Sequence, residues 1–227
     1  MNYLQQNDKV AIVAPSRKVS LTEIAAAIDE IKSWGLVPVF SKNLFAEKDQ
    51  FAGDDTTRAK DFQWAMDNEE IKAIFCARGG YGAVRIVDKL DFSKFIYCPK
   101  PIIGFSDTTV LHCKLQSLGI ESIHAPLLTT LTSTKREHID SLKTTLMGQA
   151  SDTRLVTEGN LSLLYSILGS DIDINTDGKV LFIEDLDEYL YHIDRMIVAL
   201  KRAGKFDNLK GLIVGSFSDM HDNEIPF

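Results

Sequence analysis

Short apolar runs alternate with amphipathic stretches through the first half of the chain. The amphipathic stretch after Ser20 opens with a capping box, formed by Ser20 and Glu23, and then repeats apolar residues at helical spacing. Strands that alternate with helices pair in parallel, and the helices then cover both faces of the sheet. We therefore predict an α/β fold in which residues 1–131 form a doubly wound, mostly parallel sheet domain. Its strands are predicted at residues 10–14, 36–40, 73–76, 101–105 and 120–124, and one of its helices runs through Val84, Val87 and Leu90.

The second half of the chain begins with a polar stretch. Residues 132–157 lose the apolar periodicity apart from a possible helix near residues 139–147, so we interpret them as a linker between domains. Beyond it, residues 158–227 contain a predicted strand at 179–183, a helix at 187–203 and a strand at 212–217. We expect a second, smaller α/β domain there, and it appears truncated because the chain stops in what reads as the middle of an element.

Charge and cysteine content exclude several classes of function. The net charge is -7 and the isoelectric point is near 5.2, which disfavours nucleic acid and anionic membranes as partners, because both need a basic face. The three cysteines form no CxxC pair, so we expect free thiols rather than disulfides or a structural zinc site. The N-terminal residues are polar, and no apolar run is long enough to span a membrane. We expect a soluble, cytoplasmic protein.

Three polar motifs fall where predicted strands end. They are the loop Arg78-Gly79-Gly80-Tyr81-Gly82, the pair Ser106-Asp107, and His124. Ligands of parallel α/β sheets bind beyond the carboxyl ends of the strands. The glycine-rich loop matches neither the phosphate-binding P-loop nor the dinucleotide pattern. Its backbone N–H groups could face a developing negative charge, and a tight turn that needs positive φ is an equal alternative.

Ser106 lies in a strand-to-helix turn that presents its hydroxyl at the edge of the sheet. The amides of the following helix start could then stabilise an oxyanion, as in hydrolases with a nucleophilic serine. Gly104, two places earlier, suits a tight turn, but Thr108 stands where a second glycine is usual. Taken alone, this spacing favours an ordinary helix cap over a nucleophile.

Glu184 follows the predicted strand at 179–183 and could orient a histidine in a hydrolytic triad. The alternative is that acidic residues here complement the dipole of the next helix. None of the five histidines is an obvious base, and no group of residues has the spacing of a metal site.

Taken together, seven motifs in order make the chain resemble the serine peptidase family of the bacterial LD-carboxypeptidases and the microcin C self-immunity peptidase. The motifs are residues 13–16, 77–82, 103–108, 124–126, 159–163, 181–185 and 211–215. The resemblance covers nearly the whole chain and overturns the preference for a helix cap at Ser106. It implies two domains, a Ser-Glu-His triad, no metal or cofactor, and commonly a homodimer.

The resemblance also implies roles for individual residues. Ser106 matches the nucleophile and Glu184 the triad glutamate, while the amides of Asp107 and Gly80 match the oxyanion hole. The implied reaction cleaves an L,D-peptide bond and releases terminal D-alanine from muropeptide tetrapeptides during peptidoglycan recycling. For contacts with the peptide substrate we select Arg78, Gly79 and Asn160.

One element of the family pattern has no match in this chain. In the family the triad histidine lies well beyond the segment that matches residues 211–215, and none of the five histidines occupies that position. We therefore expect the 227 residues to be inactive by themselves. Two alternatives stay open: a self-immunity peptidase acting on a peptidyl-nucleotide antibiotic, and a non-catalytic module that binds peptides or sugars.

Overall fold

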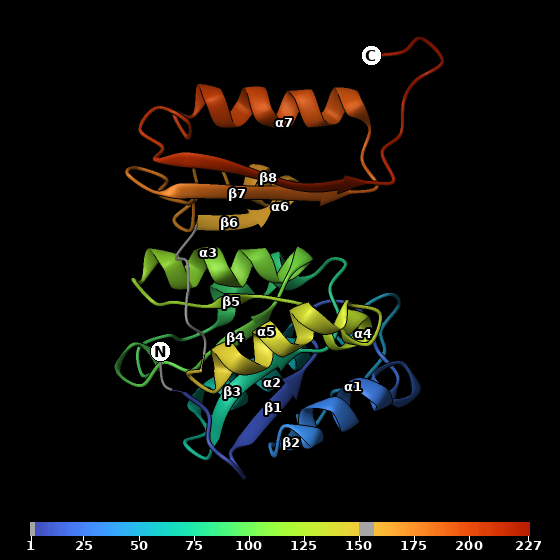
Figure 1. The fold of residues 1–227 in the computed structure, drawn as a ribbon, viewed down its shortest axis with the longest axis vertical. Coiled ribbons are helices and arrows are strands. Elements are labelled where there is room, and N and C mark those ends of the chain that lie inside the picture. Colours follow the sequence, from blue (N-terminus) through green and yellow to red (C-terminus); the bar gives the residue numbers. More distant parts are fainter. Residues whose placement is uncertain (1–2, 150–156) are drawn as a thin grey trace. The chain divides into compact units, whose positions relative to one another are not determined.

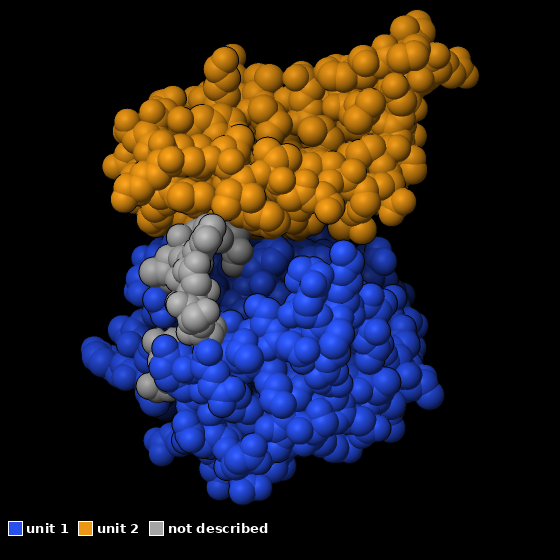
Figure 2. Space-filling model, viewed as in Figure 1, with its two compact units in different colours: residues 1–153 blue, residues 154–227 orange. Residues whose placement is uncertain are grey.

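The computed structural model describes residues 3–149 and 157–227. The chain divides into two compact units, residues 1–153 and 154–227, which Figure 2 colours separately. Each unit is built around a parallel sheet, so the predicted α/β class with a smaller second sheet is confirmed.

The sheet of the first unit has the strand order β2-β1-β3-β4-β5, with every neighbouring pair parallel (Figure 1). The chain passes from β1 outward to β2 and then returns across β1 to β3. This reversal makes the gap between the carboxyl ends of β1 and β3 the place where such sheets bind ligands. The strands are β1 (Lys9–Val13), β2 (Val37–Phe40), β3 (Ile71–Cys76), β4 (Ile102–Gly104) and β5 (Ile123–His124).

Helices cover both faces of this sheet. Val10 and Ile12 of β1, with Phe75 of β3, share one core cluster with α1 (Leu21–Ser33). Residues two apart in a strand face the same side, which explains the spacing of these strand residues. Crossovers between parallel strands are right-handed, so the reversal of strand order places α2 (Asp55–Asp67), which packs on β1 and β3, on the opposite face. The predicted capping box of Ser20 and Glu23 is present at the start of α1.

Within the stretch predicted as a linker, residues 132–157, the possible helix near residues 139–147 is confirmed. Residues Arg136–Leu146 form α5, whose Ile139, Leu142 and Leu146 are buried in the same core cluster as α1 and the short helix α4 (Leu128–Leu131). The spacing of these three residues is helical, and their burial makes α5 part of the core of the first unit. The part of the predicted linker over residues 150–156 lies outside the described residues.

The prediction of a helix through Val84, Val87 and Leu90 is wrong. Two short 3₁₀ turns, Ala83–Arg85 and Val87–Lys89, take its place. The chain enters the first turn from Gly82 at a φ of 142°, and the N–H of Ala83 is bound to the carboxylate of Asp107. These contacts hold the segment in tight turns, while Val87 and Leu90 are still buried.

The second unit has a three-stranded parallel sheet in the order β6-β7-β8. Leu161, Met196 and Leu200 form its small core between α6 and α7. Strand β7 reaches Leu186, so Glu184 lies within the strand rather than after it. The elements are β6 (Thr157–Asn160), α6 (Leu161–Ser166), β7 (Val180–Leu186), α7 (Leu190–Arg202) and β8 (Gly211–Ser218).

The helices of the described residues are short. The longest of them have 13 residues, whereas a membrane-spanning helix needs about 20. None of the helices in residues 3–149 and 157–227 is long and apolar enough to cross a bilayer.

Candidate active site

Ser106 occupies a strained turn between β4 and α3 (Thr109–Ser117). Its φ is +60°, a left-handed conformation that costs a residue with a side chain about 1–2 kcal/mol. A Cβ added to Gly104 would lie 2.7 Å from Oγ1 of Thr108, so the turn accepts only glycine there. No side chain caps the 3₁₀ turn Ser106–Thr108 or the helix that follows. The geometry is therefore that of a strained strand-to-helix turn and not of a helix cap, and the role of Ser106 as nucleophile stays a prediction.

The glycine-rich loop passes directly against this serine. A Cβ added to Gly79 would lie 3.3 Å from Oγ of Ser106 and 3.0 Å from Cδ1 of Leu127. Only the backbone of the loop can come this close to the hydroxyl. The structure thus brings together Gly79, Gly80, Ser106 and Asp107, which the sequence analysis selected from two separate motifs.

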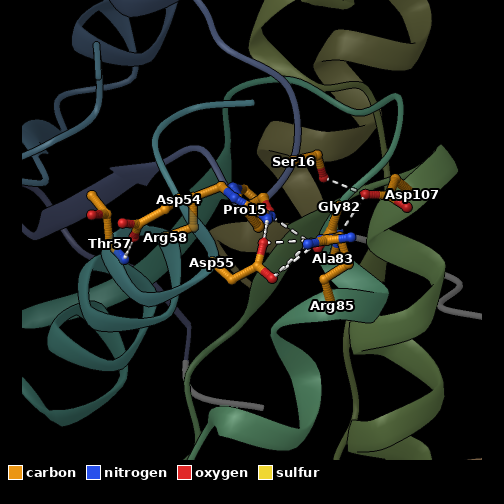
Figure 3. Close-up of polar contacts among 10 residues, drawn as sticks. All are labelled: Pro15, Ser16, Asp54, Asp55, Thr57, Arg58, Gly82, Ala83, Arg85 and Asp107. Carbon is orange, nitrogen blue, oxygen red and sulfur yellow. Dashed lines mark hydrogen bonds and ion pairs between the residues drawn. The ribbon is translucent and has the colours of Figure 1, made fainter. Parts of the chain in front are cut away.

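The side chain of Asp107 ties three loops together (Figure 3). Its Oδ2 accepts hydrogen bonds from Oγ of Ser16, at 2.5 Å, and from the N–H of Ala83, at 2.7 Å. These partners follow β1 and β3, while Asp107 itself follows β4. Burial raises the pKa of Asp107, and the hydrogen bonds from Ser16 and Ala83 oppose that rise. Sequence reasoning considered only the amide of Asp107 and missed this side-chain contact.

Arg58 supports the same loops from α2. Its buried guanidinium donates to the carbonyl oxygens of Pro15 and Gly82 and pairs with Asp55, which also binds Arg85 (Figure 3). Nothing in the sequence pattern indicated this role, because Arg58 lies one turn into a polar helix. Together, Arg58 and Asp107 hold the backbone around Ser106 in one arrangement, as an oxyanion site requires.

The guanidinium of Arg78 contacts other residues of the first unit. Its Nη1 lies 2.6 Å from Oε1 of Glu23 and donates to the carbonyl oxygen of Lys18 at 3.3 Å. The ion pair is partly exposed, so a ligand could still approach the guanidinium. The contact of Arg78 with a substrate stays a prediction.

In the second unit, Glu184 and Asn160 are register partners on β7 and β6. The amide of Asn160 donates to Oδ1 of Asp185 at 2.9 Å, and its Oδ1 accepts from the hydroxyl of Ser162. Oε1 of Glu184 is buried and has no hydrogen-bond partner among the described residues. Burial, and then the charge of Asp185, raise the pKa of Glu184 to about 7, against a hydrogen bond from Asn160 that lowers it. Oε1 of Glu184 can therefore accept a hydrogen bond from a donor that the described residues do not supply.

Two histidines are buried in the first unit. Nε2 of His112 lies 2.9 Å from the carbonyl oxygen of Gly104, and its Nδ1 lies 2.8 Å from Oγ of Ser122. Because the carbonyl can only accept, Nε2 carries the proton and Nδ1 accepts. Burial lowers the pKa of His112 to about 4 and that of His124 to about 3, so both rings are neutral near pH 7.

Two histidines of the second unit pair with carboxylates other than Glu184. His192 lies 2.6 Å from Oε2 of Glu188, and His221 lies 2.6 Å from Oδ1 of Asp187. The sequence analysis assigned the triad role to neither histidine.

Two family models match the chain. The model of the LD-carboxypeptidase N-terminal domain matches residues 10–125, and that of the C-terminal domain matches residues 154–226. A probable murein peptide carboxypeptidase of Bacillus subtilis is 34% identical over 94% of this chain and 73% of the relative. A murein tetrapeptide carboxypeptidase of Pseudomonas aeruginosa is 26% identical over 96% of this chain and 79% of the relative.

Solved structures share the fold. The muramoyltetrapeptide carboxypeptidase of Oxalobacter formigenes superposes with a TM-score of 0.83 at 26% identity, over 95% of this chain and 79% of that one. The microcin C7 self-immunity protein in complex with aspartyl sulfamoyl adenosine gives a TM-score of 0.85 at 20% identity, over 96% of this chain and 80% of that one. Both domain models match in chain order, and the Bacillus relative is similar along nearly the whole chain. The chain belongs to the LD-carboxypeptidase family.

Proposed function

We propose that the protein is a serine-type carboxypeptidase that cleaves an L,D-peptide bond and releases terminal D-alanine from muropeptide tetrapeptides. The observation that carries this proposal is the turn at Ser106, where a strained serine faces the backbone of the glycine-rich loop. The names of the Bacillus and Pseudomonas relatives, both murein peptide carboxypeptidases, support the substrate class.

In the proposed reaction, Oγ of Ser106 attacks the carbonyl carbon that precedes the terminal D-alanine. The amides of Asp107 and Gly80 donate to the oxyanion of the tetrahedral intermediate. The C–N bond then breaks, and D-alanine leaves with the proton that the serine gave up. Water attacks the resulting ester, frees the shortened peptide and returns a proton to Ser106, so the reaction needs no metal or cofactor.

Glu184 is proposed to orient the histidine that carries this proton. The unpartnered Oε1 of Glu184 supports the role, because an orienting carboxylate must have an oxygen available to accept from an imidazole N–H. The histidine itself is assigned to none of the five in this chain. Arg78, Gly79 and Asn160 remain the proposed contacts with the peptide.

The proposal is tested by substituting Ser106→Ala in the complete protein and measuring D-alanine released from a muropeptide tetrapeptide. We expect the release to fall to the uncatalysed level, while Ser117→Ala, which removes an exposed hydroxyl from the end of α3, leaves it unchanged. D-alanine release that survives in Ser106→Ala contradicts the nucleophile assignment. Tetrapeptide binding without release in the unsubstituted protein favours the non-catalytic module.

A second candidate is a self-immunity peptidase acting on a peptidyl nucleotide. One observation favours it: the half-exposed ring of Tyr81, on the glycine-rich loop, lies 5.9 Å from the ring of Phe51, and such aromatic surfaces stack on nucleobases. Cleavage of a nucleotide-linked peptide in preference to the muropeptide would select this candidate.

The resemblance also leads us to propose a homodimer in the cytoplasm. Sedimentation of the purified protein at several concentrations tests the dimer, and fractionation of the source cells tests the location.

A further inference from the structure

A carboxypeptidase must recognise the free carboxylate next to the bond that it cuts. In the proposed reaction one residue separates the attacked carbonyl from that carboxylate, and one residue spans only about 3.3–3.6 Å. A cation that binds the carboxylate must therefore lie on the loops that surround Ser106. The loops after β1 and β3 meet there, at the point where the strand order reverses.

Most cations on these loops already have carboxylate partners. Lys18 pairs with Glu47 at 2.8 Å, Arg78 with Glu23 at 2.6 Å, and Arg85 with Asp55 at 3.0 Å. Arg17 differs from them: it is exposed and has no ion pair within residues 3–149 and 157–227. Its guanidinium can therefore bind an incoming anion without giving up a contact inside the protein.

The side chain of Arg17 lies over the proposed oxyanion site. A Cβ added to Gly80 would lie 2.5 Å from Cδ and 2.8 Å from Nε of Arg17. The backbone N–H of Arg17 donates to the carbonyl oxygen of Gly79 at 3.3 Å. This hydrogen bond holds the backbone of Arg17 beside the glycine-rich loop. Burial raises the pKa of Asp107, the residue after Ser106, and the charge of Arg17 is one of the contributions that oppose this rise. Arg17 thus places an unpaired positive charge next to the residues that would hold the scissile carbonyl.

We propose that the guanidinium of Arg17 binds the terminal carboxylate of the substrate and so restricts the enzyme to peptides with a free C-terminus. This inference rests on the proposed function. A guanidinium presents a planar fork of donors that matches a carboxylate with two parallel hydrogen bonds. Its position over Gly80 would align the peptide so that the last peptide bond faces Ser106.

The experiment measures binding in the Ser106→Ala background, where the substrate stays intact. Calorimetric titration compares a muropeptide tetrapeptide with the same peptide carrying a C-terminal amide. We expect the free acid to bind at least about tenfold more tightly than the amide, because charge-assisted hydrogen bonds are stronger than neutral ones. Adding Arg17→Gln should weaken binding of the acid by roughly 10- to 100-fold and leave binding of the amide unchanged.

Two further variants separate the role of Arg17 from the general charge of the surface. Lys18→Gln removes the neighbouring cation, which pairs with Glu47, and should preserve the preference for the acid. Arg17→Lys keeps the charge but loses the fork, so it should give an intermediate preference. Thermal unfolding monitored by circular dichroism checks that each variant is folded.

The outcomes distinguish the inference from the function on which it rests. If the folded Arg17→Gln variant prefers the acid as strongly as its parent, Arg17 does not bind the carboxylate, although the proposed function stands. If the folded Ser106→Ala protein binds neither peptide, the muropeptide function fails and the inference falls with it.

Discussion

Two carboxyl groups, the buried Asp107 of the first unit and the partly buried Glu184 of the second, have pKa values shifted in the same direction but different contacts. Asp107 lies at the carboxyl end of the first sheet, and Glu184 lies near the carboxyl end of β7 in the second. Burial is the largest cause of a raised pKa for both. The hydrogen bonds around them are different, however.

Each carboxyl group has one buried oxygen without a hydrogen-bond partner among the described residues, Oδ1 of Asp107 and Oε1 of Glu184, so the two groups differ in what their other contacts do. Oδ2 of Asp107 accepts from Ser16 and Ala83 and so joins three loops. Glu184 instead accepts from Asn160, its neighbour on the adjacent strand β6 of the same sheet. A raised pKa alone therefore does not mark a catalytic acid, and the partners of each oxygen must also be known.

Replacing Glu184 gives the largest expected effect. Glu184→Gln should lower D-alanine release by about 10²- to 10⁴-fold, because an amide cannot hold the triad histidine in its charged form as a carboxylate does. Below about pH 4.5, where Glu184 is protonated in both the folded and the unfolded state, the free energy of unfolding should change by less than about 1 kcal/mol, because the carboxyl group and the amide have nearly the same shape. Activity assays and calorimetry measure the two quantities, and an active Glu184→Gln variant would remove the proposed triad role.

Replacing Asp107 should affect stability instead. Asp107→Leu leaves the hydroxyl of Ser16 and the N–H of Ala83 buried without an acceptor, which should cost about 2–5 kcal/mol. Urea unfolding followed by tryptophan fluorescence measures this loss within the first unit, because both tryptophans, Trp34 and Trp64, lie there.

The exposed Asp88 supplies the matched control for this experiment. Asp88→Leu should change stability by no more than about 0.5 kcal/mol. A cost below about 1 kcal/mol for Asp107→Leu would show that its carboxylate does not hold the loops.

A smaller effect is expected for Gly80→Ala in the glycine-rich loop. Gly80 has a φ of +101°, where an added Cβ is strained, and that Cβ would also displace the side chain of Arg17. We expect a loss of about 1–2 kcal/mol in the free energy of unfolding. Gly119→Ala, also at positive φ but with open space around it, is the comparison: equal losses would mean that Arg17 does not restrict Gly80.

The pH dependence of stability should give a further effect, which the partial exposure of Glu184 reduces. The pKa of Glu184 is about 7 in the folded protein against 4.5 ordinarily, so between these values the folded state keeps a proton that the unfolded state has released. Stability from this group is therefore fully present below about pH 4.5 and is lost as the pH rises to 7. The slope is at most about 1.4 kcal/mol per pH unit, and solvent screening makes it smaller. Calorimetry at several pH values measures the free energy of unfolding of the parent and of Glu184→Gln. We expect it to fall between pH 4.5 and 7 relative to the variant only in the parent. If the two proteins show the same pH dependence, the pKa of Glu184 is not raised.

Much of the fold could be predicted because strands and helices leave local periodic patterns. The five strands of the first sheet and the capping box at Ser20 were found in this way. Helix α5 was expected only as a possible helix within a linker, because the polar residues around Ile139, Leu142 and Leu146 leave a narrow apolar stripe that does not show packing against the core. The helix expected through Val84 failed for a different reason, since a partner distant in sequence, Asp107, binds the N–H of Ala83.

The sequence by itself determined that an α/β fold would place Ser106 and the glycine-rich loop at the same edge of the sheet. The reason is that the spacing of apolar residues along the chain predicts the alternation of strands and helices. Tertiary structure alone decided which polar groups would be satisfied. Ser16 and Asp107 are 91 residues apart, and Arg58 reaches loops from another helix. The same holds for Arg17, whose lack of an ion pair among the described residues depends on where Glu23, Glu47 and Asp55 find their partners. Pairing and burial depend on distances in space, which residue spacing along the chain does not encode.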